Sequence, residues 1–305
     1  MSLVASALVP LTVLIVLGIA LKRSRFLPDT FWPGLDRLNY WVFFPSLIFV
    51  SLATTEGGLA GSGPVALSVW GGLGLVAIAA LALRTRLAAD GPAFTSVFQG
   101  SIRFNSYVAF IVLPVLYPGS EGLTALLVAL TVPVVNVLCV SVLARHGAGA
   151  ALRWRTLLGS IVTNPLIVAS VLGVIMGRLD VPLGPLASSL QMLGQAALAA
   201  GLLSVGATLR FRNVRSGWRQ VLASMALKFA GLPLATWAVA SLLGVRPELL
   251  GPLLLFQAMP TASASYVLAR AMRGDERLMA AILAVHTLAA LAWLPVVAWW
   301  ARIVA

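Results

Sequence analysis

The amino-acid sequence predicts an all-α polytopic membrane protein with ten transmembrane helices, arranged as an inverted repeat of five helices plus five. Three observations lead to this fold class. The 305 residues are 60% hydrophobic and only 10% charged, with a mean hydropathy of +0.99. The basic residues are concentrated in every other connection between successive apolar segments. The two halves of the chain share short motifs at a nearly constant offset.

The apolar content predicts the transmembrane spans. Roughly a quarter of the residues of a soluble domain are charged, and an apolar run of about 20 residues is long enough to cross a bilayer as a helix. Clusters of Gly and Pro separate the runs, which leave no room for a soluble domain. The predicted spans are 3–21, 32–53, 63–83, 94–116, 122–144, 156–177, 186–209, 217–243, 250–272 and 278–301.

The first apolar run begins almost at Met1 and has no Lys or Arg before it. A secretory signal peptide normally carries positive charge ahead of its apolar region. Here the basic residues Lys22, Arg23 and Arg25 follow the run instead. We therefore expect a retained first helix.

The distribution of Lys and Arg predicts the orientation. The odd-numbered connections between spans hold 15 of these residues, whereas the even-numbered connections and the C-terminal tail hold 3. An excess of Lys and Arg in short loops marks the cytoplasmic side of a membrane. Both termini are therefore expected to be extracytoplasmic, and the regular alternation supports the count of ten spans.

An internal repeat divides the chain. Phe98-Gln99 recurs as Phe256-Gln257, and the segment 106–108 (SYV) recurs as 265–267, at offsets of 158 and 159. We place the first five-helix repeat at residues 1–150 and the second at 151–305. Because five is odd, the second repeat enters the membrane from the opposite face. Such inverted repeats are typical of alternating-access carriers.

The fourth and ninth spans contain residues that interrupt helices. The segment 99–107 reads QGSIRFNSY and the segment 257–266 reads QAMPTASASY. Pro260 removes a backbone donor, and the N-terminus of a half-helix favours an anion. Carriers with inverted repeats bind their substrates at such interrupted helices. The alternative is a simple Pro kink, in which Thr261 and Ser263 bond back to the helix.

Three Arg, Lys or His residues lie away from the ends of predicted spans, where such groups are functional candidates. Arg103 is beside the fourth-span interruption, Lys228 is in the eighth span and His286 is in the tenth. Arg103 or Lys228 would neutralise a bound carboxylate, and His286 could carry a proton. The alternatives are a snorkelling Lys228 or one bonded to backbone carbonyls, and a packing role for His286.

Neutral amides add further candidates. Asn136, Asn164, Gln191 and Gln195 lie in apolar stretches. Gln191 and Gln195 are four residues apart and share one helical face. These residues would line a ligand site or hold helices together.

The acidic residues argue against several functions. All nine Asp and Glu residues lie in loops or near span ends, whereas a sodium/proton antiporter needs buried carboxylates. No acid-rich metal motif is present, and no metal or cofactor is expected. One buried His without a convincing Ser partner makes a poor protease. The net charge of +12 follows from topology, so nucleic acid is not expected as a partner.

Several segments resemble the auxin efflux carrier family of bacterial and plant transporters. They include 99–108 (QGSIRFNSYV), Asn164-Pro165-Leu166, 203–209 (LSVGATL), and 258–262 (AMPTA) with 265–270 (SYVLAR). The resemblance covers most of the chain in the same order. One departure concerns Pro114, which lies nine residues after Asn105, whereas many members have Gly-x-Pro about seven after it. The interruption is thus expected at 103–107 and not at a proline.

The resemblance implies a fold like that of sodium/proton antiporters and bile acid symporters, with scaffold and transport domains and a crossover of broken helices four and nine. Family substrates are organic acids such as auxin, malonate, malate and lactate. By motif, Asn105, Tyr107, Asn136, Pro260 and Thr261 would line or shape the site.

The expected function is secondary transport of a small organic anion by alternating access in a bacterial inner membrane, proton-coupled or potential-driven. The alternative is a receptor that binds a carboxylate without moving it; an enzyme is not expected. Expected partners are the anion and the bilayer, with protons and a second copy of the chain as further candidates. The candidate substrate-binding residues are Arg103, Asn105, Tyr107, Asn136, Asn164, Gln191, Gln195, Pro260, Thr261, Ser263 and Tyr266, and those for charge or proton coupling are Lys228 and His286.

Overall fold

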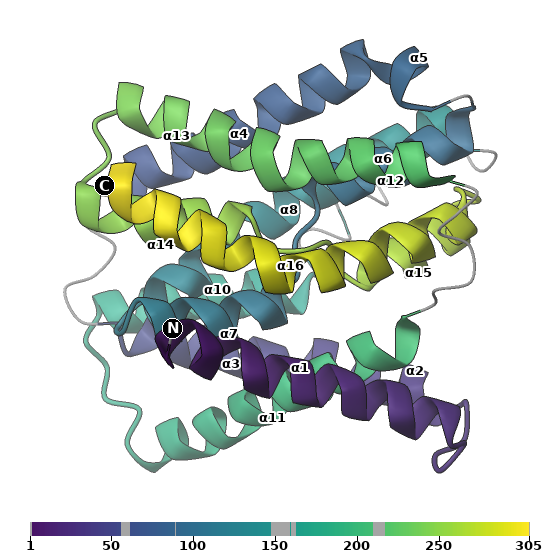
Figure 1. The fold of residues 1–305 in the computed structure, drawn as a ribbon. Helices are drawn as coiled ribbons and strands as arrows, with labels where there is room; N and C mark the ends of the chain where they lie inside the picture. The colour runs from purple at the N-terminus through teal and green to yellow at the C-terminus, as the bar shows by residue number, and fades with distance from the viewer. Residues whose placement is uncertain are drawn as a thin grey trace. The chain divides into compact units, whose positions relative to one another are not determined.

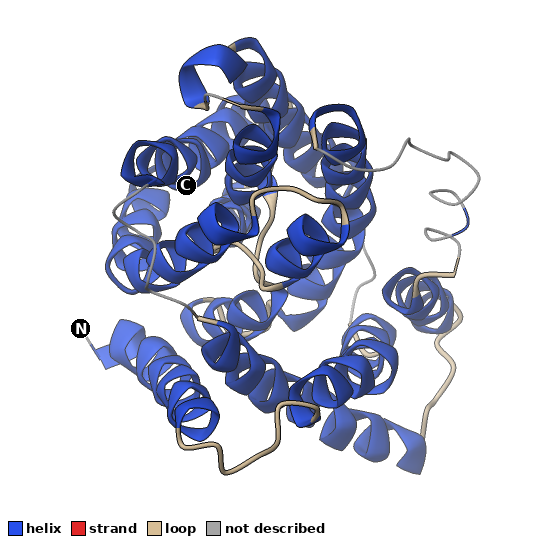
Figure 2. Ribbon diagram, turned by 90° about the vertical axis from the view of Figure 1, so that its right-hand side faces the viewer, coloured by secondary structure: helices blue, strands red, loops and turns tan. Residues whose placement is uncertain are grey.

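The computed structural model describes residues 2–55, 62–88, 90–147, 159, 163–209 and 217–304. These residues form helices joined by turns and irregular segments, with no strand among them (Figure 2). The helices are α1 (Ser2–Arg23), α2 (Phe31–Leu38), the π-helix η1 (Asn39–Phe43), α3 (Phe44–Ala53), α4 (Ser62–Ala82), α5 (Arg84–Leu87), α6 (Gly91–Ile102), α7 (Ser106–Leu116), α8 (Glu121–His146), α10 (Pro165–Arg178), α11 (Pro185–Thr208), α12 (Trp218–Met225), the π-helix η3 (Ala226–Gly231), α13 (Leu232–Leu242), α14 (Pro247–Gln257), α15 (Ala264–Ala271) and α16 (Glu276–Val304).

Six described helical segments are long and apolar enough to cross a membrane. The other four predicted spans contain shorter or interrupted helices, and most of 156–162 lies outside the described residues. The all-helical membrane class is thus confirmed. The six segments are Ser6–Arg23, Gly63–Ala82, Glu121–His146, Pro185–Thr208, Trp218–Leu242 and Glu276–Val304.

Contacts divide the chain into two compact units, each built from several stretches of sequence. Unit 1 comprises Met1–Ala60, Tyr107–Ala129 and Arg155–Thr208. Unit 2 comprises Gly61–Ser106, Leu130–Trp154 and Leu209–Ala305. Each unit therefore contains segments from both predicted repeats, and the repeat boundary near residue 150 stays a prediction.

Glycines bring the helices of unit 1 together. α1 lies beside α11, and α3 beside α10 (Figure 1). A Cβ atom at Gly18 would lie 2.1 Å from the carbonyl oxygen of Leu203, and one at Gly206 would lie 2.1 Å from that of Ile15. Small residues allow close approach of helices in a membrane, where apolar burial alone gives little drive for association. α1 and α11 thus pack backbone to backbone.

Thr236 is a meeting point of three helices in unit 2. A Cβ atom at Gly72 of α4 would lie 2.1 Å from the Thr236 hydroxyl oxygen of α13. That oxygen also accepts a hydrogen bond of 2.9 Å from Gln257 Nε2, at the last residue of α14. The end of α14, which precedes the predicted ninth-span interruption, is held in place by this contact.

The two π-helical segments each precede a proline. η1 ends two residues before Pro45, and η3 ends two residues before Pro233. A proline inside a helix lacks the N–H that would bond the carbonyl four residues earlier and clashes with that turn, and π turns accommodate such distortions. For Pro233 this carbonyl belongs to Phe229, and Trp293 Nε1 of α16 donates to it at 2.7 Å. A side chain therefore replaces the missing backbone donor.

Candidate functional site

The predicted fourth span is interrupted where the sequence indicated. α6 ends at Ile102 and α7 begins at Ser106. Arg103 is extended, with φ of −73° and ψ of 152°, although its N–H still bonds the Gln99 carbonyl at 2.9 Å. The interruption contains no proline, and Pro114 lies inside α7. The expectation that it rests on 103–107 is confirmed.

The predicted ninth span is interrupted over a longer stretch. α14 ends at Gln257 and α15 begins at Ala264, which leaves residues 258–263 outside regular helix. Pro260 lies in this stretch and Thr261 is fully buried. The Thr261 and Ser265 hydroxyl oxygens are 3.2 Å apart. Ser265 was not among the sequence-predicted site residues, although the repeated SYV motif begins with it.

The two interruptions meet within unit 2. The Asn105 N–H donates a 2.7 Å hydrogen bond to the Pro260 carbonyl oxygen, and the rings of Phe104 and Phe256 lie 4.7 Å apart between centroids. Buried backbone groups require hydrogen-bond partners, and irregular backbone at membrane depth is tolerated only where protein or a cavity satisfies it. Each interruption thus supplies a partner that the other needs.

Arg103 carries positive charge to this meeting point. Its side chain is buried, and its Nη2 donates a 3.0 Å hydrogen bond to Asn136 Oδ1 of α8. The Cys139 thiol also interacts with the guanidinium. Among the described residues no carboxylate pairs with Arg103, and its Nε has no partner. A guanidinium has five donors, so this charged group retains capacity for an anionic ligand.

The predicted site residues of unit 1 take different roles. The Tyr107 ring packs over Gly201 and lies 5.1 Å from the Phe44 ring. Asn164 caps α10, because its Oδ1 accepts from the Leu166 N–H at 2.9 Å. That contact gives Asn164 a structural role. The remaining predicted residues of unit 1, Gln191 and Gln195, are exposed on α11.

The two predicted coupling residues lie together in unit 2. Lys228 and His286 are each 0% exposed. His286 Nε2 is 3.3 Å from the Ser224 hydroxyl oxygen, and its ring lies 5.1 Å from the Phe229 ring. Lys228 Nζ and His286 Nδ1 have no hydrogen-bond partner among the described residues. The alternative of a snorkelling or carbonyl-bonded Lys228 is therefore wrong, because burial and packing enclose the amine.

The remaining predicted residues of α15 are less buried. Ser263 precedes α15 and is half-buried, without a side-chain hydrogen bond to the helix N-terminus. Tyr266 is half-buried as well. Gln99, which was not predicted, has both side-chain polar atoms buried and unpartnered among the described residues. The sequence did contain a signal for Gln99, because the Phe-Gln pair to which it belongs recurs as Phe256-Gln257.

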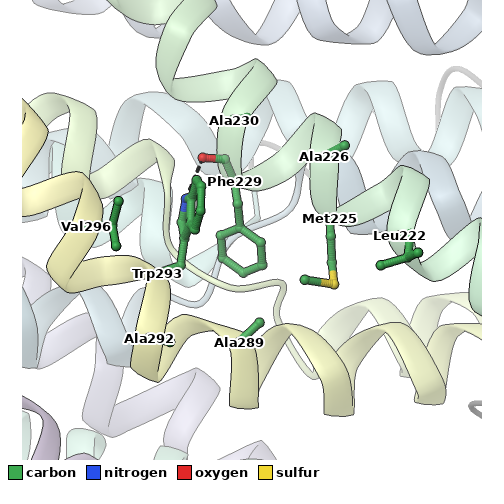
Figure 3. Close-up of a pocket in the computed structure, with 9 residues that line it drawn as sticks. All are labelled: Leu222, Met225, Ala226, Phe229, Ala230, Ala289, Ala292, Trp293 and Val296. Atoms are coloured by element: carbon green, nitrogen blue, oxygen red, sulfur yellow. Dashed lines mark hydrogen bonds between the residues drawn. The ribbon is translucent and has the colours of Figure 1, made fainter.

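An apolar groove lies between α12, η3 and α16 (Figure 3). Its volume is about 490 Å³. It contains none of the predicted site residues, and its wall is Leu222, Met225, Ala226, Phe229, Ala230, Ala289, Ala292, Trp293 and Val296. Among the described residues, no three His, Cys, Asp or Glu side chains form a group that could hold a metal ion.

Comparisons with known proteins assign the class. Residues 150–298 match the family model described as a membrane transport protein. The "probable auxin efflux carrier component 5c" of Oryza sativa subsp. japonica is 32% identical over 124 residues, which are 38% of this chain and 33% of the relative. The chain thus matches about a third of the length of this curated relative. These matches support an integral membrane transport protein.

The same two matches support the predicted resemblance to the auxin efflux carrier family. The segment matched by the family model contains Lys228, the second interruption and His286, whereas Arg103 lies before it. The roles of the individual site residues remain proposals.

Proposed function

We propose that the chain is a secondary transporter of a small organic anion and works by alternating access. The observation that carries this proposal is the hydrogen bond between the two interruptions, from the Asn105 N–H to the Pro260 carbonyl. It lies beside Arg103, which is buried and has no acidic partner in the part of the chain that the structure describes. Interrupted helices that meet in a membrane are a recurring way to build a substrate site from backbone and a few side chains.

The substrate carboxylate would bind Arg103, since an isolated buried cation is unfavourable unless an anion compensates it. Asn136 holds the guanidinium through its Oδ1. Asn105, Thr261 and Ser263 would supply hydrogen bonds, and the N-termini of α7 and α15 favour negative charge. Tyr107, Asn164, Gln191, Gln195 and Tyr266 remain further candidates from the sequence.

The membrane arrangement belongs to the same proposal. Ten spans in an inverted repeat, with both termini extracytoplasmic, are supported by the alternation of Lys and Arg and the nearly constant offset between motifs. The resemblance to bacterial transporters supports a bacterial inner membrane as the location. Alternating access requires one group of helices to move as a body. Unit 2 contains both interruptions, and we take it as that body.

The substrate class follows from the charge of the site and from the family. A single guanidinium without an acidic partner among the described residues fits a carboxylate, and the name of the rice relative specifies auxin. Auxin, lactate, malate and malonate are therefore the compounds to test first.

Counterflow in proteoliposomes tests the proposal. Vesicles that contain purified protein and an excess of unlabelled acid should accumulate the same radiolabelled acid transiently, since a carrier exchanges substrate across the bilayer. A receptor would bind the acid and shift thermal unfolding without any exchange. Thermal stabilisation by one of the four acids with no counterflow would favour the receptor and reject transport.

A further inference from the structure

The two lysines of the chain have opposite environments. Lys22 lies near the end of α1 and bonds the Asp29 carboxylate at 2.7 Å. Lys228 lies in η3, is fully buried, and its Nζ has no hydrogen-bond partner among the described residues. A buried ammonium without a counter-charge is strongly unfavourable. Lys228 therefore needs either a nearby anion or the loss of its proton.

The helices around η3 supply no carboxylate to Lys228 in the part of the chain that the structure describes. α4, α6 and α13 contain no ionisable side chain, and Arg219 of α12 is exposed. α16 contributes His286, whose imidazole interacts electrostatically with Lys228, and Arg103 follows α6. The other ionisable residues of α16, which lie at its ends, are Glu276, Arg277 and Arg302.

A series of close contacts joins Lys228 to the first interruption. Ser224 lies four residues before Lys228, and its hydroxyl oxygen is 3.3 Å from His286 Nε2. A Cβ atom at Gly100 of α6 would lie 2.3 Å from that same oxygen. Arg103 is only three residues after Gly100. The two buried basic side chains, Arg103 and Lys228, thus belong to one packed region of unit 2.

We propose that Lys228 is the proton-binding residue of the transporter, so that an anionic substrate and a proton bind together and leave together. This inference rests on the proposed function. When an anion binds at Arg103, its negative charge stabilises the ammonium form of Lys228. The Lys228 amine therefore takes up one proton on its lone pair. When the anion leaves, the proton leaves as well. His286 and Ser224 are positioning residues.

Thermodynamic linkage between the proton and the substrate predicts how the binding of each affects the other. If substrate favours protonation of Lys228, then protonation favours substrate binding by the same factor. Arg103 stays charged throughout, because a guanidinium does not release its proton in proteins. One proton would accompany each monoanion, and transport of lactate would be electroneutral.

The surroundings of η3 isolate the amine from lipid. Figure 3 shows the Phe229 ring and the Trp293 side chain in the apolar groove, with the Trp293 indole bonded to the Phe229 carbonyl. The Phe229 ring also lies 5.1 Å from the His286 ring. Phe229 therefore contacts both the apolar groove and the buried imidazole, and these apolar neighbours favour a dry environment for Lys228.

The test compares two measurements in proteoliposomes, with lactate and malonate as radiolabelled probes. Counterflow at equal pH reports binding and exchange alone. Accumulation driven by an inward proton gradient, with the membrane potential clamped by valinomycin and potassium, reports coupling. The variant is Lys228→Met, which keeps an unbranched apolar chain, and the matched control is Lys22→Met at the other lysine.

Wild-type protein and Lys22→Met should show both activities. Lys228→Met should retain measurable counterflow but lose gradient-driven accumulation by at least about tenfold. Lys228→Arg, with a fixed charge, should retain exchange, ignore the proton gradient, and respond to the membrane potential, because each lactate then carries a net negative charge.

Accumulation by Lys228→Met equal to that of wild-type protein would overturn the inference. If that variant fails to reconstitute, wild-type vesicles with a trapped pH dye decide the matter: lactate entry without proton entry rejects Lys228 as the proton site. Absence of wild-type counterflow with every acid tested would instead reject the proposed function itself.

Discussion

The two interruptions of unit 2 follow the same Phe-Gln pair in the sequence, but they differ in charge, in proline content and in the hydrogen bonds of the Gln side chain. The Phe-Gln pair recurs in α6 and α14, yet Gln257 donates to Thr236 whereas Gln99 has no partner among the described residues. The first interruption covers three residues and contains Arg103 and Asn105 but no proline. The second covers six, with Pro260, a buried hydroxyl and no charge. Thus a repeated scaffold supplies two helix ends, and the charge needed for an anion comes from only one of them.

The largest expected effect follows from removing that charge. Arg103→Gln should lower the rate of carboxylate counterflow by about 100-fold, since hydrogen bonds to charged groups contribute roughly 1.5–3 kcal/mol. Arg86→Gln, at an exposed position of α5, is the control and should behave as wild-type protein. Equal rates for Arg103→Gln and wild-type protein would remove Arg103 from the site.

The next effect concerns the side chain of Asn105. Its backbone N–H makes the contact to Pro260, so Asn105→Ala should leave the interruption and the folded protein intact. Loss of the amide should reduce exchange by at least about tenfold, the cost of one hydrogen bond left unmade in a buried site. Thermal unfolding in detergent monitors the fold. Unchanged exchange kinetics would show that the amide does not contact substrate.

Two glycine substitutions test how closely α6 is packed, through the thermal stability of the protein. Gly100→Ala should destabilise the protein by about 1–3 kcal/mol, because its Cβ would lie 2.3 Å from the Ser224 oxygen and 2.7 Å from Ile282 Cγ2. Gly34→Ala of α2 is the control, since no atom lies within 4 Å of its Cβ position. That variant should be neutral or slightly more stable. Equal unfolding temperatures for both would contradict the α6–α12 contact.

The smallest effect is expected at Pro260. The first interruption exists without a proline, so Pro260→Ala should keep the second one open and lower exchange only about two- to fivefold. Hydrogen exchange at residues 258–263 measures whether helix forms there. New protection across that segment, with loss of transport, would show that the proline alone maintains the second interruption.

The fold class was predictable because a bilayer limits a chain to few solutions. Apolar runs of about 20 residues predict helices whatever their tertiary neighbours, and most of the predicted ends agree with the described helices within a few residues. The exception is the span predicted to begin at 156, since α10 begins at Pro165 and most of 156–162 lies outside the described residues. The π turns were not predicted. They depend on where Pro45 and Pro233 fall relative to packing partners such as Trp293, and hydropathy carries no information about those partners.

The site was predictable in part. Arg103 and Asn136 lie 33 residues apart in sequence, and both were candidates, yet only the packed helices bring Nη2 and Oδ1 to 3.0 Å. Asn164 illustrates the opposite case. Its polarity in an apolar run suggested a ligand contact, whereas the structure gives it the cap of α10, because a side-chain amide serves a helix end as readily as a ligand.

The sequence by itself determined the membrane class, the resemblance to a transporter family and the positions of both interruptions, since each rests on local composition or on motifs that need no neighbours. Only the tertiary structure decided which polar groups are satisfied. Lys22 and Lys228 are the same residue type, and the difference between a paired surface amine and a buried unpartnered one arises from what the surrounding helices bring within hydrogen-bond reach.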